Sequence, residues 1–132
     1  MTYLDANIFV YAAINNGEIG HKCREILTKI SKNNFSAYTS SLTWDEVVHA
    51  IWKKEGKEKA LEEGKLFLQL PNIIYLNVTP TIIFKSQEII EKYNLKPRDS
   101  IHTASMIING IKEIISDDPH FDKIKEIKRI KP

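Results

Sequence analysis

Several carboxylates of this sequence stand where they could share a divalent cation. They are Asp5, Glu46, Asp99 and the adjacent pair Asp117 and Asp118. Carboxylates held close together repel one another unless a cation lies between them. Hard carboxylate oxygens, without a cysteine cluster or paired histidines, favour Mg²⁺ or Mn²⁺ over zinc. Such ions can activate a water and stabilise a leaving oxygen, which is the chemistry of phosphodiester cleavage.

Each of these acids also has a local structural explanation. Asp5 or Asn7 could cap a helix, and Thr43 to Glu46 fits a capping box. Asp99 could complement a helix dipole from the first turn, and Asp117-Asp118-Pro119 could be a turn. The local explanations do not account for acids that follow several strands at the same end, so the cluster is more informative than any member.

The elements that would position these acids alternate between strands and helices. Strands are expected at residues 1–4, 35–39, 73–78 and 113–116, with a small edge strand at 127–130, and the segment 73–78 is expected to be buried. Helices are expected at 8–14, at 23–33, from Ser40 towards Gly56, at 60–68, after Thr79-Pro80, and from Pro97 to Gly110. This alternation predicts an α/β fold with a four- to five-stranded parallel sheet covered on both faces. Ligands of such sheets bind beyond the carboxyl ends of the strands, where all the acids would meet.

Size and composition indicate one domain spanning residues 1–132. The chain is 42% hydrophobic and 27% charged, with a net charge of +2, which is ordinary for a globular protein. The N-terminus lacks a secretory pattern, and two prolines interrupt the uncharged run from Leu66 to Phe84, so a cytoplasmic location is expected. Cys23, the single cysteine, is interpreted as a small buried hydrophobe.

Four segments together resemble the PIN-domain ribonucleases, especially the small toxins of VapBC toxin–antitoxin systems. The segments are YLDAN, TSSLTWDEV, KPRDSIHTA and IISDDPHFD, in that order along nearly the whole chain. The resemblance implies a PIN-like α/β/α sandwich and an endoribonuclease that depends on Mg²⁺ or Mn²⁺. It also implies RNA as the substrate, a homodimer, and a small antitoxin partner that blocks the site.

Carried over residue by residue, the resemblance makes Asp5, Glu46 and Asp99 metal-binding acids, with Asn7 as a polar orienting residue. The closing pattern of the family is a Thr or Ser, a variable residue, an Asp, two further residues and a Phe. It maps here onto Ser116, Asp118 and Phe121. Asp118 is therefore the preferred fourth acid, and Asp117, at the variable position, is the alternative.

The roles of several neighbouring polar residues are left open by the sequence. Thr39 or Ser40 could hold the acids in place or cap a helix. Arg98 could contact phosphate or form an ion pair. His102 is expected to be a packed or partly exposed histidine rather than a general base, and His120 a loop residue.

Other functions fit the sequence less well. A receiver-type signalling domain would need a phospho-accepting Asp after the third strand, where Asn77-Val78-Thr79 stands. An aspartate-nucleophile phosphatase would need an Asp at the position of Asn7. A housekeeping RNA-processing PIN nuclease, or a PIN-like domain that binds RNA or a partner without cutting, remain as alternatives to a toxin.

Overall fold

A computed structural model describes residues 1–33 and 36–132 of the chain. Strands and helices alternate along most of its length. In chain order the elements are β1 (Thr2–Leu4), α1 (Ala6–Ile14), α2 (Glu18–Lys32), β2 (Ala37–Ser40), α3 (Thr43–Glu55), α4 (Lys57–Leu68), β3 (Ile73–Leu76), α5 (Pro80–Tyr93), α6 (Pro97–Ile108), β4 (Glu113–Ile115), the short 3-10 helix η1 (Pro119–Lys123) and β5 (Lys128–Ile130). No helix within the described ranges is long and apolar enough to cross a membrane.

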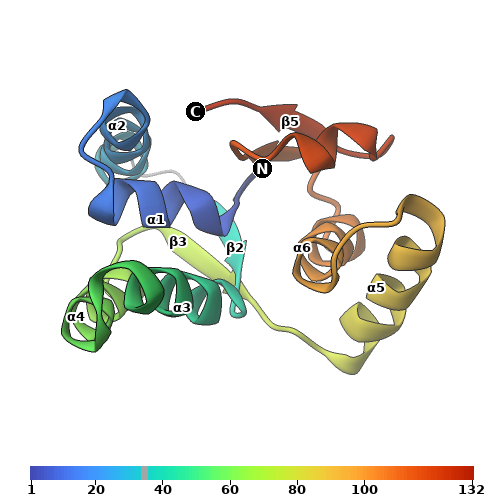
Figure 1. Ribbon diagram of the computed structural model, residues 1–132. Coiled ribbons are helices and arrows are strands. Elements are labelled where there is room, and N and C mark those ends of the chain that lie inside the picture. Colours follow the sequence, from blue (N-terminus) through green and yellow to red (C-terminus); the bar gives the residue numbers. More distant parts are fainter. Residues whose placement is uncertain (34–35) are drawn as a thin grey trace.

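The strands form one five-stranded sheet in the order β3-β2-β1-β4-β5, and every pair is parallel. The predicted parallel sheet is therefore confirmed. The chain first adds β2 and β3 on one side of β1 and then places β4 and β5 on the other (Figure 1). Strand order thus reverses between β1 and β4, and such a reversal opens a crevice at the carboxyl edge of the sheet.

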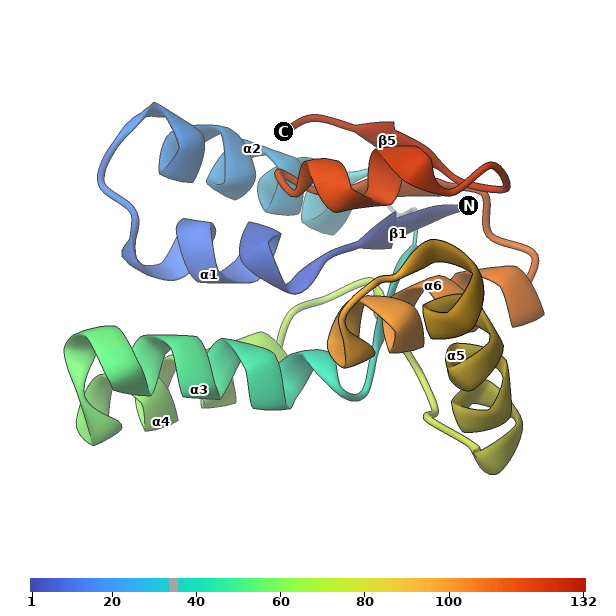
Figure 2. The same cartoon turned by 45° about the vertical axis from the view of Figure 1, so that its right-hand side comes forward.

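Helices cover both faces of the sheet because successive strand side chains point to opposite faces. Tyr3 of β1 packs with residues of α5, α6 and η1, whereas its neighbour Leu4 packs with residues of α1 to α4. Figures 1 and 2 show α1 to α4 on one side of the sheet and α5 with α6 on the other. Residues placed just after β1 and β4 therefore lie between the two helical layers.

Some element boundaries differ from the sequence-based predictions. The helix predicted from Ser40 begins at Thr43, because the Ser40 hydroxyl accepts the Leu42 N–H at 3.0 Å and forms a turn first. The segment 73–78 was predicted to be a buried strand, but β3 lies at the edge of the sheet, and Ile74 is 40% exposed. The predicted strand 35–39 begins with Phe35, which lies outside the described residues.

Candidate metal centre

Asp5 joins the end of β1 to the neighbouring strand β4. Its side chain is buried, and one carboxylate oxygen accepts the Ala6 N–H at 2.7 Å, which makes Asp5 the N-cap of α1. The other oxygen accepts the Ser116 hydroxyl at 2.5 Å, just after β4. The helix-cap explanation is correct, but it uses only one oxygen, and the same carboxylate also reaches the crevice between β1 and β4.

The loop after β4 is held in place from two sides. Ser116 is buried, and its hydroxyl oxygen accepts the Asp118 N–H at 3.0 Å and the Asn7 side-chain amide at 3.4 Å. From β5, the Arg129 guanidinium donates to the Ser116 carbonyl at 3.1 Å and to both carboxylate oxygens of Asp122. These bonds fix the direction in which the loop presents Asp118.

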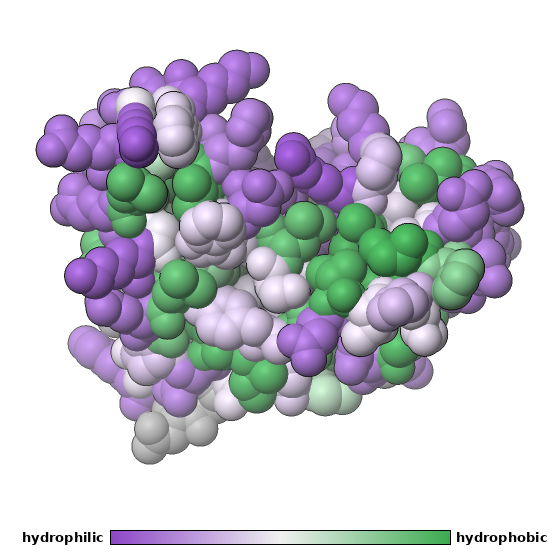
Figure 3. All heavy atoms as spheres, turned by 90° about the horizontal axis from the view of Figure 1, so that it is seen from below, coloured by the Kyte–Doolittle hydropathy of each residue, from purple (hydrophilic) through white to green (hydrophobic). Residues whose placement is uncertain are grey.

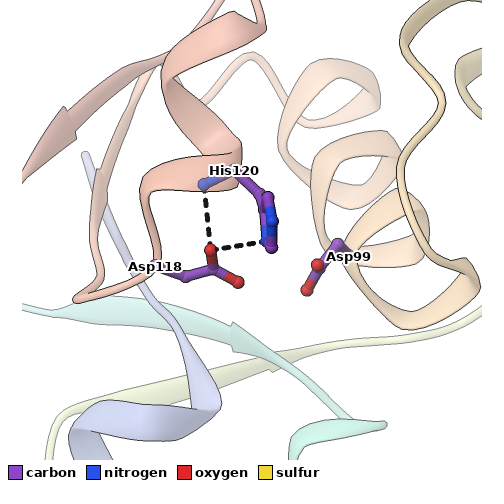
Figure 4. Close-up of side chains that lie close together, drawn as sticks. All are labelled: Asp99, Asp118 and His120. Atoms are coloured by element: carbon purple, nitrogen blue, oxygen red, sulfur yellow. Dashed lines mark hydrogen bonds and ion pairs between the residues drawn. The ribbon is translucent and has the colours of Figure 1, made fainter.

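Asp99, Asp118 and His120 form a tight group at this loop (Figure 4). Each offers one potential ligand atom, and these atoms all lie within 4.8 Å of one another. Asp118 accepts the backbone N–H of His120 at 2.9 Å, and the same carboxylate oxygen lies 2.8 Å from Nδ1 of the His120 ring. His120, expected to be a loop residue, lies in η1. No sequence pattern pointed to it, because its proximity to Asp99 arises only in the folded chain.

The two candidates for the fourth acid have different surroundings. Asp118 is partly buried beside Asp99, whereas Asp117 is exposed. The Asp117 carboxylate instead accepts the Tyr11 hydroxyl at 3.4 Å, and its backbone N–H donates to Asn7 at 3.5 Å. Asn7 thus contacts the loop at two points. The geometry favours Asp118 as the acid that faces Asp99.

The charges of this group oppose one another when no cation is present. Burial, together with the negative charges of Asp118 and Asp5, raises the pKa of Asp99 to about 6, with His102 partly offsetting these effects. Burial also raises the pKa of Asp5, and His102 and the Ser116 hydroxyl act in the opposite direction. A cation would relieve this repulsion. The carboxylate oxygens of this group are the kind of ligand that Mg²⁺ and Mn²⁺ prefer.

Glu46 reaches the site from the first turn of α3 and bonds to a histidine of α6. Its carboxylate accepts from Nε2 of His102, so the capping-box explanation of Glu46 is wrong. The Thr43 hydroxyl that would complete such a box pairs instead with the Thr39 hydroxyl at 2.7 Å. Thr39 donates to the Leu4 carbonyl at 2.8 Å and so fixes the strand just before Asp5.

His102 does more than the packed side chain expected from the sequence. It is completely buried, and its Nδ1 lies 2.6 Å from the Tyr3 hydroxyl. Burial favours the neutral ring, but the bond to Glu46 and its negative charge outweigh that effect and raise the pKa of His102. Burial likewise raises the pKa of Tyr3, with Asp5 and Glu46 adding to the shift, so the phenol keeps its proton at neutral pH.

A cleft of about 390 Å³ adjoins the acids, and it is lined by Glu46, Lys96, Pro97, Arg98 and Asp99. Arg98 forms an exposed ion pair with Asp45 at 3.2 Å, which is one of its two predicted roles. The Ser40 hydroxyl accepts the Leu42 N–H in the turn before α3. The positively charged side chains of Lys96 and Arg98 therefore lie beside the carboxylates of Glu46 and Asp99 in the same cleft.

The sequence that folds into this sheet also matches the model of a known family. The model of the PIN domain matches residues 2–127, and the chain therefore belongs to the PIN domain family. No curated protein sequence matches the chain significantly. Solved structures of the same fold extend the comparison to particular relatives.

Several solved structures of the same fold are VapC or VapBC proteins. VapC20 of Mycobacterium tuberculosis, described as a toxin that cleaves the sarcin-ricin loop, is 12% identical with a TM-score of 0.80 and 95% coverage of both chains. VapBC2 of Rickettsia felis, bound to a promoter DNA fragment, is 19% identical with a TM-score of 0.75, covering 99% of this chain and 98% of that one. DNA-bound VapBC of Salmonella typhimurium is 16% identical with a TM-score of 0.73, covering 98% and 96%. At these identities the likeness establishes the fold.

Proposed function

We propose that this protein is an endoribonuclease of the cytoplasm that depends on Mg²⁺ or Mn²⁺, and that it is the toxin of a type II toxin–antitoxin pair. The observation that carries the proposal is the group of Asp99, Asp118 and His120, with Asp5 and Glu46 near enough to raise the pKa of Asp99, in a chain of the PIN domain family. Raised pKa values such as those of Asp5 and Asp99 are often found at functional sites. The VapBC origin of the structural relatives supports the toxin role.

The residues of the site divide into those that would hold a cation and those that orient them. Asp99 and Asp118 each have a carboxylate oxygen close to the other. Asp5 and Glu46 add negative charge near Asp99. A bound divalent cation would polarise the phosphate and activate the attacking water. Asn7 orients the loop that carries Asp118.

The surroundings of the acids suit a nucleic-acid backbone. Lys96 and Arg98 line the cleft beside Glu46 and Asp99, so a phosphate entering it would meet positive charge next to the cation site. Arg98 would exchange its exposed partner Asp45 for a phosphate at little cost, because exposed ion pairs are weak. RNA is proposed as the substrate because the chain belongs to the PIN domain family.

The test is cleavage of several RNAs by the purified protein with Mg²⁺, with Mn²⁺, and with excess EDTA. We expect cleavage with either ion and a loss of at least about a hundredfold with EDTA, because the repelling carboxylates have no role in catalysis without a cation. Adding Mn²⁺ back should restore the rate. Cleavage that persists in EDTA would refute a metal-dependent nuclease, and the absence of cleavage under every condition would favour a domain that only binds.

Two apolar surface areas are proposed as contact surfaces for the two protein partners, an antitoxin and a second copy of the chain. A largely apolar cleft of about 540 Å³ lies between α1, α2 and α4, with Phe9, Ala13, Leu27, Leu66 and Phe67 among its lining residues. Figure 3 shows apolar side chains gathered on the face seen from below, with hydrophilic ones around its rim. Large exposed apolar areas commonly mark protein interfaces. The cleft is proposed to receive the antitoxin, because the structural relatives include toxin–antitoxin complexes.

Leu66→Glu should weaken antitoxin binding without lowering RNA cleavage. Leu66 is 49% exposed and lines the cleft, so the charge would be tolerated in the free protein but buried in the complex. We expect at least a tenfold loss of affinity for the protein encoded by the neighbouring reading frame, measured by calorimetry. The control is Leu61→Glu, on the same helix and 53% exposed. Equal affinity in both variants would place the antitoxin elsewhere.

A further inference from the structure

A buried polar chain connects the sheet to the candidate metal centre. It runs from the Tyr3 hydroxyl on β1 to Nδ1 of His102 on α6, and from Nε2 of His102 to the Glu46 carboxylate on α3. The His102 side chain is completely buried, and that of Glu46 is 16% exposed. The Tyr3 and His102 rings also meet edge to face, with centroids 5.6 Å apart. The chain therefore ties together one strand and a helix from each face of the sheet.

We propose that His102 is a positioning residue that holds the Glu46 carboxylate in the direction the divalent cation requires, and that Tyr3 in turn fixes the His102 ring. This inference rests on the proposed function. It assigns to two buried residues a role at a site that neither of them lines.

The direction of the hydrogen bonds is set by the chemistry of the partners. An ionised carboxylate can only accept, so Nε2 of His102 carries the hydrogen that Glu46 receives. In the neutral ring Nδ1 then accepts, and the Tyr3 hydroxyl is the donor beside it. Each polar group of the chain is thereby satisfied, and the ring is held at both ends.

Glu46 needs such support because nothing else in its described hydrogen bonding restrains it. A glutamate side chain has three rotatable bonds, and its freedom is costly to remove when a ligand binds. Carboxylates that bind metal ions are commonly held by hydrogen-bonding partners of their own, and losing such a partner typically weakens metal binding 10- to 100-fold. A histidine present only to fill the core would have no such effect on cation affinity.

Two substitutions of His102 separate these possibilities. In His102→Gln the terminal amide nitrogen lies close to the position of Nε2 and can still donate to Glu46, whereas in His102→Asn the shorter amide reaches only as far as Nδ1. Both remove the ring and leave one buried partner unsatisfied. The readouts are the Mn²⁺ dissociation constant, measured by electron paramagnetic resonance, and the melting temperature in EDTA.

We expect Mn²⁺ affinity within about threefold of wild type for His102→Gln and a loss of at least tenfold for His102→Asn, with similar decreases in melting temperature. Equal Mn²⁺ affinities in the two variants would overturn the inference. If the Asn variant does not fold, the inference is tested with Tyr3→Phe, whose Mn²⁺ affinity should fall about threefold. The control is Tyr38→Phe, on the neighbouring strand, which should keep the wild-type affinity. Equal affinities in these two would also overturn it. Failure of the proposed function is distinct, because wild-type protein would then bind no Mn²⁺.

Discussion

Replacing Asp99 by Asn is expected to lower RNA cleavage by at least about a thousandfold while the protein stays folded. Asp99 lies where the fields of Asp5 and Asp118 overlap, so its charge contributes most to holding a cation there. Losing a cation that stabilises the transition state costs several kcal/mol, and about 4 kcal/mol corresponds to a thousandfold in rate. The measurement is single-turnover cleavage at saturating protein with Mn²⁺ present.

Asp118→Asn and Asp117→Asn provide the matched comparison for Asp99→Asn. The two residues are adjacent and carry the same charge, but only Asp118 faces Asp99. We expect Asp118→Asn to lose at least about a hundredfold in cleavage rate, because it removes a proposed cation ligand. Asp117→Asn should stay within about threefold of wild type. A large loss at Asp117 with full activity at Asp118 would reverse the assignment, and full activity in Asp99→Asn would remove the metal centre from the mechanism.

The stability of the metal-free protein should decrease as pH rises, and Mn²⁺ should reverse that trend. The pKa of Asp99 is raised from 3.8 to about 6, so its stabilising contribution is fully present below about pH 4 and is lost as pH rises through about 6. The raised pKa values of Asp5 and His102 act in the same direction. Above about pH 6 the Asp99 carboxyl is mostly ionised and available to Mn²⁺. At a hundred times its dissociation constant, Mn²⁺ would add about 2.7 kcal/mol.

This linkage can be measured as melting temperatures in EDTA and in Mn²⁺ between pH 5 and 8. The difference between the two conditions should grow with pH and reach about 8 °C for a chain of this size. Asp99→Asn should melt higher than wild type in EDTA at pH 7.5 and lose most of its response to Mn²⁺. In Asp122→Asn, where the pKa is lowered by Arg129, the Mn²⁺ response should be unchanged. A difference independent of pH would contradict ionisation of Asp99 as the step linked to binding.

The sheet and the position of the acids could be predicted because both depend on local patterns. Asp5 follows an apolar strand, Asp99 follows a proline at a helix start, and Asp118 closes another apolar strand. Parallel strands bring such positions to one edge. The edge position of β3 was missed, because an apolar run does not reveal whether a strand has one neighbour or two.

The interactions that orient the acids could not be predicted, because they join residues far apart in the sequence. Tyr3 and His102 are separated by 99 positions, and Glu46 and His102 by 56. Neither spacing has a local signature. Asp5 illustrates the same limit, since one of its carboxylate oxygens caps α1 and the other accepts the hydroxyl of Ser116, 111 positions away.

The bond between Asp5 and Ser116 has a consequence for the order in which the protein becomes functional during synthesis. These residues are 111 positions apart, and the loop that carries Ser116 is anchored by Arg129 of β5, the strand that follows it. A nascent chain that lacks residues 116–129 would have Asp5, Glu46 and Asp99 but neither Asp118 nor the Ser116 hydroxyl that bonds to Asp5. The proposed cation site would therefore form only after β4, the loop that follows it and β5 have all been synthesised.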